Sequence, residues 1–259
     1  MESYVQFIGA TLLTLALVDI GRRWGGAYPS PLSPATDRQR EGLEIVVLYV
    51  LALGTVTYGI LVARDVIAFN PTVRFLDRRF PLYFFLSTAT MVVIPISLEV
   101  GVRDRSLRDL GIRSPVAWRP TLLLVGMGIL LGLAPIAFGL PSPKSVVPLL
   151  LALYSPVFTE ELLYRGVIQS KLERLVSQER AWVFSGILFG ISHIPNDFFG
   201  PFWVASGSDP LVATFRLTAQ TATGFLLGLL YMKSRTLAAP ILGHYLSNNL
   251  ATVISTILQ

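Results

Sequence analysis

Long apolar segments constrain the fold of this chain more than any other feature of its sequence. Of its 259 residues, 53% are hydrophobic and only 14% are charged, whereas soluble globular proteins carry about 25% charged residues. A membrane-spanning helix needs about 20 mostly apolar residues. The candidate segments for such helices are 3–20, 45–63, 81–100, 120–140, 147–170, 181–195, 211–232 and 237–257. We therefore predict an all-α, polytopic membrane protein with about eight transmembrane helices, in which residues 1–259 form a single membrane domain.

Lysine and arginine are distributed unevenly between the predicted loops. The loops after the first, third, fifth and seventh predicted helices hold fourteen of them, and the remaining loops hold five. The positive-inside rule then predicts that the side with fourteen faces the cytoplasm and that both termini face outward. The net charge of +5 is spread over short loops, which favours contact with a lipid bilayer over binding of nucleic acid.

Ionisable side chains inside the predicted spans are concentrated in the second half of the chain. Glu160, Glu161 and Arg165 lie within one apolar segment, and the chain's two histidines, His193 and His244, lie in later ones. Such residues usually face the interior of a helix bundle and mark function. At about 1.5 Å of rise per residue, Glu160, His193 and His244 are about 16, 18 and 10 Å from the cytoplasmic ends of their helices. We therefore expect them to share one depth band in the cytoplasmic half.

The spacing of these residues predicts which of them share a helix face. Glu161 and Arg165 are separated by four positions and can form an ion pair, and His244 and Asn248 have the same separation. The second pair would direct an imidazole and a carboxamide into the same space.

These residue types suit the hydrolysis of an amide bond. A carboxylate and a histidine can activate a water molecule as a general base, and a second histidine with an asparagine can donate hydrogen bonds to an oxyanion. The absence of cysteine excludes a cysteine nucleophile. One carboxylate and two histidines could instead bind zinc with an open position, although the H-E-x-x-H signature of zinc proteases does not occur. The spacing alone leaves both chemistries open.

Several other residues are better explained by packing. Phe189 is separated by four positions from His193 and is predicted to pack beside it. Arg216 lies near the outer end of the seventh predicted helix, where we expect its side chain to extend to the membrane interface. The glycines of "GMGILLG" and "TGFLLG" are typical of close helix packing.

Three motifs together resemble a known family. "EELLYRG" resembles the E-E-x-x-x-R motif of the CPBP family, which comprises CAAX prenyl protease 2-like and bacteriocin-immunity-type membrane proteins. "FGISH" resembles the family's F-x-x-x-H motif, and "HYLSNN" resembles its H-x-x-x-N motif. They occur in the family's order, within residues 147–257.

The resemblance implies an intramembrane endopeptidase that acts near the cytoplasmic leaflet. In this interpretation Glu160 and His193 activate water, and His244 and Asn248 stabilise the oxyanion. Glu161 and Arg165 support the site. The resemblance favours a mechanism without a cofactor or metal, with zinc kept open as an alternative. It implies a prenylated CAAX-type peptide, or another membrane-associated peptide, as the substrate.

A different class of function uses the same residues without cleavage. The chain could be a bacteriocin-immunity or scaffold protein, or a proton-coupled transporter in which Glu160, His193 and His244 relay protons. Cleavage of a peptide, and its loss on substitution of Glu160, would separate the protease from these alternatives.

Overall fold

A computed structural model describes residues 2–75 and 78–258 of the chain. The first half contains α1 (Glu2–Trp24), α2 (Arg38–Ala63) and a hairpin of β1 (Thr72–Phe75) and β2 (Arg78–Pro81). A continuous helical segment follows, made of α3 (Leu82–Thr88), the π-helical turn η1 (Ala89–Val93), α4 (Ile94–Ile96) and the π-helical turn η2 (Ser97–Val102). Next come α5 (Trp118–Leu133) and the short 3₁₀ helix η3 (Ala134–Phe138).

The second half begins with a long segment that contains α6 (Val146–Ala152), η4 (Leu153–Phe158), α7 (Thr159–Glu161), η5 (Leu162–Gln169) and α8 (Ser170–Leu175), of which η4 and η5 are π-helical. It continues with α9 (Gln178–Ile191), α10 (Ile194–Phe199), α11 (Pro201–Ala205), α12 (Pro210–Ser234) and α13 (Ala238–Ile257).

The helical membrane fold is confirmed, whereas the number of eight spans is not. Five helical segments of the described chain combine the length and the apolar character needed to cross a membrane. They are Tyr4–Trp24, Arg38–Ala63, Leu82–Val102, Trp118–Phe138 and Val146–Leu175, which correspond to the first five predicted segments. The last two predicted segments form the long helices α12 and α13, which are not among these five. The sixth forms only the 14 residues of α9. The hairpin was not predicted.

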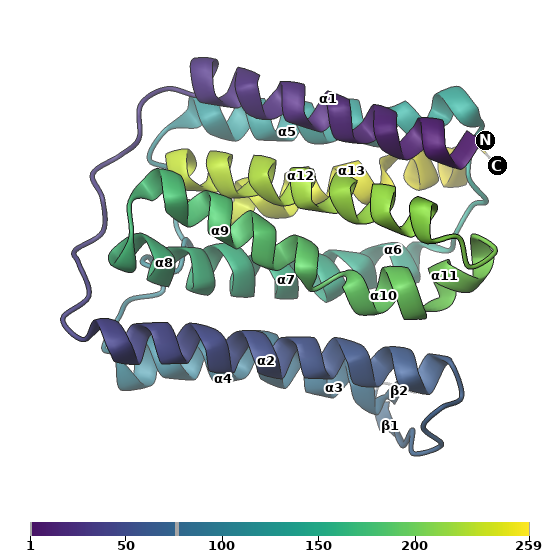
Figure 1. Cartoon of the computed structure of the whole chain (residues 1–259), viewed down its shortest axis with the longest axis horizontal. Helices are drawn as coiled ribbons and strands as arrows, with labels where there is room; N and C mark the ends of the chain where they lie inside the picture. The colour runs from purple at the N-terminus through teal and green to yellow at the C-terminus, as the bar shows by residue number, and fades with distance from the viewer. Residues whose placement is uncertain (1, 76–77, 259) are drawn as a thin grey trace.

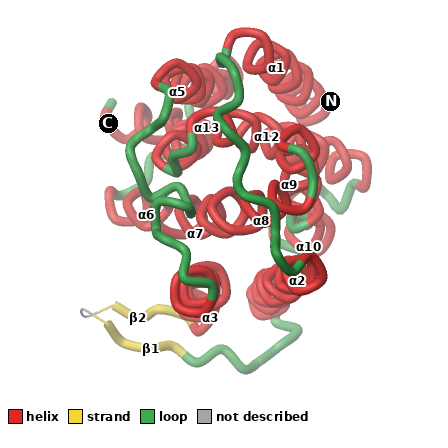
Figure 2. The backbone as a smooth tube through the Cα atoms, turned by 90° about the vertical axis from the view of Figure 1, so that its left-hand side faces the viewer, coloured by secondary structure: helices red, strands yellow, loops and turns green. Residues whose placement is uncertain are grey.

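The helices lie side by side in layers (Figure 1). Helices α1 and α5 form one face, and α12 and α13 lie beneath them (Figure 1). Seen along the helices, α7, α8 and α9 form the next layer, and α2 and α3 form the opposite face (Figure 2). The motif helices α7, α9 and α13 therefore occupy the middle of the protein, between two outer layers.

Small residues allow α5 and α13 to approach closely. A Cβ atom on Gly128 would lie 2.6 Å from the carbonyl oxygen of Gly243 and 2.7 Å from its Cα atom. These separations are too short for a side chain, so the two helices pack backbone against backbone. Gly126 is on the same helix, yet a Cβ atom there would meet nothing within 4 Å. The predicted role in close packing therefore holds for Gly128 and does not hold for Gly126.

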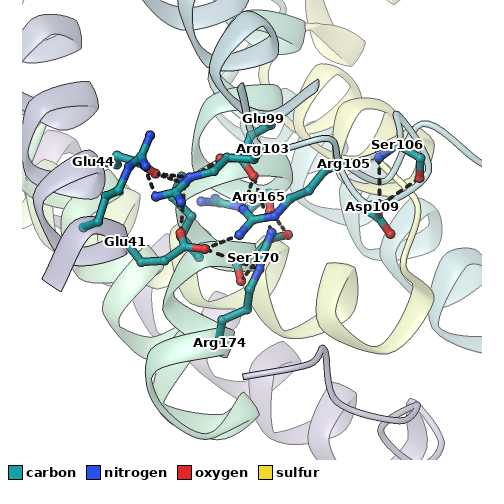
Figure 3. Close-up of polar contacts among 12 residues, drawn as sticks. Glu41, Glu44, Glu99, Arg103, Arg105, Ser106, Asp109, Arg165, Ser170 and Arg174 are labelled. Atoms are coloured by element: carbon teal, nitrogen blue, oxygen red, sulfur yellow. Dashed lines mark hydrogen bonds and ion pairs between the residues drawn. The ribbon is translucent and has the colours of Figure 1, made fainter. Parts of the chain in front are cut away.

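A cluster of buried charges joins α2, η2 and α8 (Figure 3). It lies at the end of the bundle that carries the loops after α1, η2, α8 and α12, here called the arginine-rich loops (Figure 1). Lys171 is fully buried, and its Nζ atom lies 2.9 Å from Glu41 and 2.6 Å from Glu44. The same atom lies 2.5 Å from Glu99. Further ion pairs in this charge cluster involve Arg103, Arg105 and Arg174. Because buried charges are costly unless they are paired, the cluster holds these elements in one arrangement.

Candidate active site

Four of the predicted site residues line one cavity of about 610 Å³. They are Glu160, His193, His244 and Asn248. They come from α7, from the turn between α9 and α10, and from α13. The structure thus brings the three motifs together, although more than 80 residues separate Glu160 from Asn248. The volume is in the range of about 300–1,000 Å³ that is usual for ligand pockets.

The helix that carries both glutamates is interrupted shortly before them. Ser155 has non-helical backbone angles, with φ of −129° and ψ of 118°, and Pro156 follows it and lines the cavity. After this break, α7 presents Glu160 to the cavity, whereas Glu161 is fully buried. Consecutive residues on a helix are about 100° apart around the axis. The two carboxylates therefore face different surroundings.

Glu161 connects the first motif to the third. One of its oxygens, Oε2, lies 3.2 Å from Nε of Arg165, as the four-residue spacing predicted. The other, Oε1, lies 2.8 Å from Nδ1 of His244. Glu161 and Arg165 have no exposed surface, and the His244 side chain is 6% exposed. Because the Arg165 guanidinium and the Glu161 carboxylate are both buried, each depends on the other for charge compensation.

His193 is oriented by a backbone contact. Its Nδ1 atom lies 2.8 Å from the carbonyl oxygen of Phe189. With the proton on Nδ1 donated to this oxygen, Nε2 is left with a free lone pair. The predicted helix 181–195 is wrong at its end, because α9 stops at Ile191 and His193 lies on the turn before α10. His193 lines the cavity from this turn.

Phe189 lies at the centre of the site and is only 2% exposed. The centroid of its ring is 4.7 Å from that of His193 and 6.0 Å from that of His244. The Arg165 Cζ atom is 4.8 Å from the same ring centroid. The predicted packing of Phe189 beside His193 is present, and the ring also spaces both histidines and faces a buried cation.

The expectation for Arg216 is wrong. Its side chain does not extend away from the bundle but lines the same cavity as Glu160. Its Nε atom lies 3.3 Å from Oδ1 of Asp197, and the Asp197 carboxylate is fully buried. The sequence reasoning missed Asp197 because it lies on the short helix α10, outside the predicted spans. An acidic residue placed four positions after a motif histidine was the available signal.

Tyr83, Tyr164, Asn196 and Gln220 are further cavity-lining residues that the sequence did not identify. Three of them come from segments outside the motifs. Spacing offered a signal for Tyr164, four positions after Glu160, and for Asn196, three positions after His193. It offered none for Tyr83.

The motifs contain four acidic or histidine positions, which are Glu160, Glu161, His193 and His244. In the part of the chain that the structure describes, no three histidine, aspartate or glutamate side chains lie close enough together to hold a metal ion. Both Glu161 and His244 already use their facing atoms for each other. This contact uses Nδ1 of His244 and leaves its Nε2 atom free, and Glu160 and His193 line the same cavity. The choice between metal-free and zinc chemistry therefore stays a prediction.

Comparison with known families agrees with the motifs. Residues 141–250 match the family model described as type II CAAX prenyl endopeptidase Rce1-like. This segment is Rce1-like. It includes every motif position from Glu160 to Asn248, so the predicted resemblance to the CPBP family is confirmed there. The Rce1-like segment and the five apolar helices together support an integral membrane protein of a protease family. No curated protein and no solved structure matches the chain.

The cavity lies toward one end of the bundle. Its lining includes Ala63, the last residue of α2, and Tyr83, near the first residue of α3. The arginine-rich loops follow α1, η2, α8 and α12, whose ends lie at the opposite end of the bundle (Figure 1). His244, by contrast, is the seventh residue of α13 and lies nearer the loop that carries Lys233 and Arg235. The cavity therefore extends from His244 toward the end opposite the arginine-rich loops, and the cytoplasmic side of the site stays a prediction.

Proposed function

We propose that the chain is a CAAX-type intramembrane endopeptidase in which Glu160 and His193 activate a water molecule. His244 and Asn248 stabilise the oxyanion. The observation that carries this proposal is that the two adjacent glutamates have different surroundings. Glu161 is occupied by Arg165 and His244, whereas Glu160 lines the cavity together with His193. Glu160 is thus the carboxylate that can reach a water molecule and a peptide.

In the proposed reaction, the Glu160 carboxylate takes a proton from a water molecule that is also hydrogen-bonded to Nε2 of His193. The water oxygen forms a bond to the carbonyl carbon of the peptide. The resulting oxyanion accepts hydrogen bonds from Nε2–H of His244 and from the Asn248 amide. The carbon–nitrogen bond then breaks, and Glu160 returns the proton to the departing amine.

Donation from Nε2 of His244 requires a ring that is protonated at both nitrogens. The Glu161 carboxylate supports this state because it accepts a hydrogen bond from Nδ1–H at 2.8 Å and compensates the positive charge. Arg165 in turn holds Glu161. The supporting roles of Glu161 and Arg165 follow from this chain of contacts.

The substrate class follows from the family resemblance. A prenylated CAAX-type peptide or another membrane-associated peptide would reach a cavity inside the bundle from the lipid bilayer. We propose that the reaction uses no metal, because Glu160 and His193 can activate a water molecule without one. A chelator would then leave cleavage unchanged.

We further propose that the cavity end faces the cytoplasm. Among the fourteen positive residues at the other end, Arg103, Arg105, Lys171, Arg174 and Arg235 pair with buried or nearly buried glutamates. These charges are compensated inside the protein, which weakens the count on which the positive-inside prediction rests. This orientation puts both termini in the cytoplasm, since they lie at the cavity end (Figure 1).

The natural absence of cysteine allows a direct test of orientation. Single cysteines at Ser208, at the cavity end, and at Ser114, at the opposite end, are exposed and conservative. In intact cells, an impermeant thiol reagent is expected to label Ser114→Cys and to spare Ser208→Cys. The reverse pattern would place the cavity end outside.

The activity is tested with purified protein and a farnesylated CAAX peptide, compared with the same peptide lacking the lipid. Wild-type protein is expected to cleave at least one of the two, and Glu160→Gln to cleave neither. Cleavage that a chelator abolishes and zinc restores would overturn the metal-free proposal. If the wild type cuts no peptide, the immunity, scaffold or transporter class takes its place.

A further inference from the structure

Arg216 is the only lysine or arginine among the described residues that line the cavity. Its side chain keeps 25% of its surface exposed, in contrast to Arg165, which is fully buried. Its guanidinium is therefore within reach of a ligand in the cavity. The proposed reaction gives it no task.

The guanidinium of Arg216 is held in place by two neighbouring short helices. On α10, the buried Asp197 carboxylate lies 3.3 Å from Nε, and Asn196 donates a hydrogen bond to the same Asp197 at 3.3 Å. On α11, the ring of Phe202 stacks against the guanidinium, with its centroid 3.7 Å from Cζ. These contacts fix the orientation of the side chain before any ligand binds, which lowers the cost of binding.

The geometry leaves part of the guanidinium available. The nearest contact with Asp197 uses Nε, and no hydrogen bond from Arg216 to another described residue is present. Arginine has five N–H donors in a planar fork that matches the two oxygens of a carboxylate. An anion of this shape, rather than a neutral polar group, is the ligand that such a preoriented fork recognises best.

We propose that Arg216 binds the free C-terminal carboxylate of the peptide substrate and so selects peptides that are cut near their C-terminus. This inference rests on the proposed endopeptidase function and deepens it. A peptide has one such group at a defined distance from its scissile bond, and Arg216 shares its cavity with Glu160 and His193.

The position of Arg216 sets the approximate distance between the bound carboxylate and the scissile bond. Asp197, its partner, lies one helical turn beyond His193, since the Asp197 amide donates to the His193 carbonyl oxygen at 2.9 Å. A helical turn rises about 5.4 Å, and an extended peptide spans about 3.4 Å per residue. A carboxylate on Arg216 is therefore a small number of residues from a bond held at His193. The expected product is a short C-terminal peptide.

The test compares two substrates that differ in one group, a peptide with a free C-terminal carboxylate and the same peptide with a C-terminal amide. Wild-type protein is expected to prefer the acid by about tenfold or more in kcat/KM, as for a hydrogen-bonded charge. Arg216→Gln is expected to lose this preference and to cut both peptides as slowly as wild type cuts the amide. An unchanged preference in Arg216→Gln overturns the proposal.

Removal of Arg216 alone leaves the Asp197 carboxylate buried and unpaired, which can destabilise the fold. The double variant Asp197→Asn/Arg216→Gln removes both charges and is expected to fold and to lose the preference. Arg23→Gln is the matched control, because Arg23 is an exposed arginine whose side chain is 72% accessible. It is expected to retain the wild-type preference. If Arg216 only held α10 and α12 together, its substitution would change the cleavage rates of the acid peptide and the amide peptide equally.

Two further arms keep the inference distinct from the proposed activity and from binding of lipid phosphate. Binding of the two peptides to Glu160→Gln reports recognition without turnover. The peptide with the free carboxylate is expected to bind more tightly than the peptide with the amide. Equal binding overturns the carboxylate proposal even if cleavage occurs. The assays are run in neutral phosphatidylcholine vesicles and repeated with an anionic lipid. Arg216→Gln could instead change the cleavage rate only with anionic lipid, and equally for both peptides. That result assigns Arg216 to the lipid phosphate and overturns the proposal.

Discussion

Nδ1 of His244 lies 2.8 Å from Oε1 of Glu161, and this contact joins two helices whose motifs are 83 residues apart. Both residues are buried, and Arg165 completes the set on the other oxygen of Glu161. The contact explains why two adjacent glutamates can coexist in an apolar helix. One is neutralised by partners inside the protein, and the other faces the cavity.

Substitution of Glu161 is expected to damage both stability and activity. In Glu161→Gln, Arg165 stays buried and loses its only ion pair among the described residues. The loss of one partner of a buried pair costs about 3–5 kcal/mol. Thermal unfolding in detergent should show a clearly lowered Tm, and cleavage should fall because His244 loses its acceptor.

The double variant Glu161→Leu/Arg165→Met separates these two effects. Replacing both members of a buried ion pair with apolar residues is often neutral for stability. We expect Tm to recover relative to Glu161→Gln while cleavage stays lost. Recovery of cleavage would show that Glu161 is not needed to hold His244.

Glu160→Gln is expected to reduce kcat by about 10²–10⁴-fold, the contribution of a general base, without lowering Tm. The side chain lines the cavity, so the amide replaces the carboxylate with little change in packing. Asn249→Ala is the matched control on α13, since among the described residues the Asn249 amide bonds only to the carbonyl of Tyr245 in its own helix. A Glu160→Gln protein that retains wild-type kcat contradicts the assigned role.

The stability that the charge cluster gives to the fold is expected to depend on Lys171. In Lys171→Met, the carboxylates of Glu41 and Glu99 lose a fully buried cation, and we expect a loss of about 3–5 kcal/mol in stability. Arg23→Met removes an exposed ion pair with Asp19 and should cost less than about 1 kcal/mol. Denaturation of both variants under the same conditions measures the loss of stability in each. Similar losses in the two variants would contradict the prediction.

Two glycines on α5 provide a matched test of helix packing. Gly128→Ala places a Cβ atom against the backbone of Gly243, so we expect a lowered Tm. Gly126→Ala meets nothing within 4 Å and should be neutral or stabilising by up to about 1 kcal/mol, because alanine favours a helix more than glycine does. Equal effects would mean that α5 and α13 do not approach as described.

The sequence by itself determined the apolar helices and the membrane environment, because the length and composition of such helices are local properties that a linear pattern carries. It also determined the Glu161–Arg165 pair, since a four-residue spacing on one helix brings two side chains together. The motifs and their order identified the family, which the comparison confirmed for residues 141–250.

Only the tertiary structure decided the contacts between helices. The contact between Glu161 and His244, the shared cavity of His193 and Glu160 and the pairing of Arg216 with Asp197 all depend on the relative rotation and offset of separate elements. A linear pattern does not encode these quantities, because they result from the packing of the whole bundle.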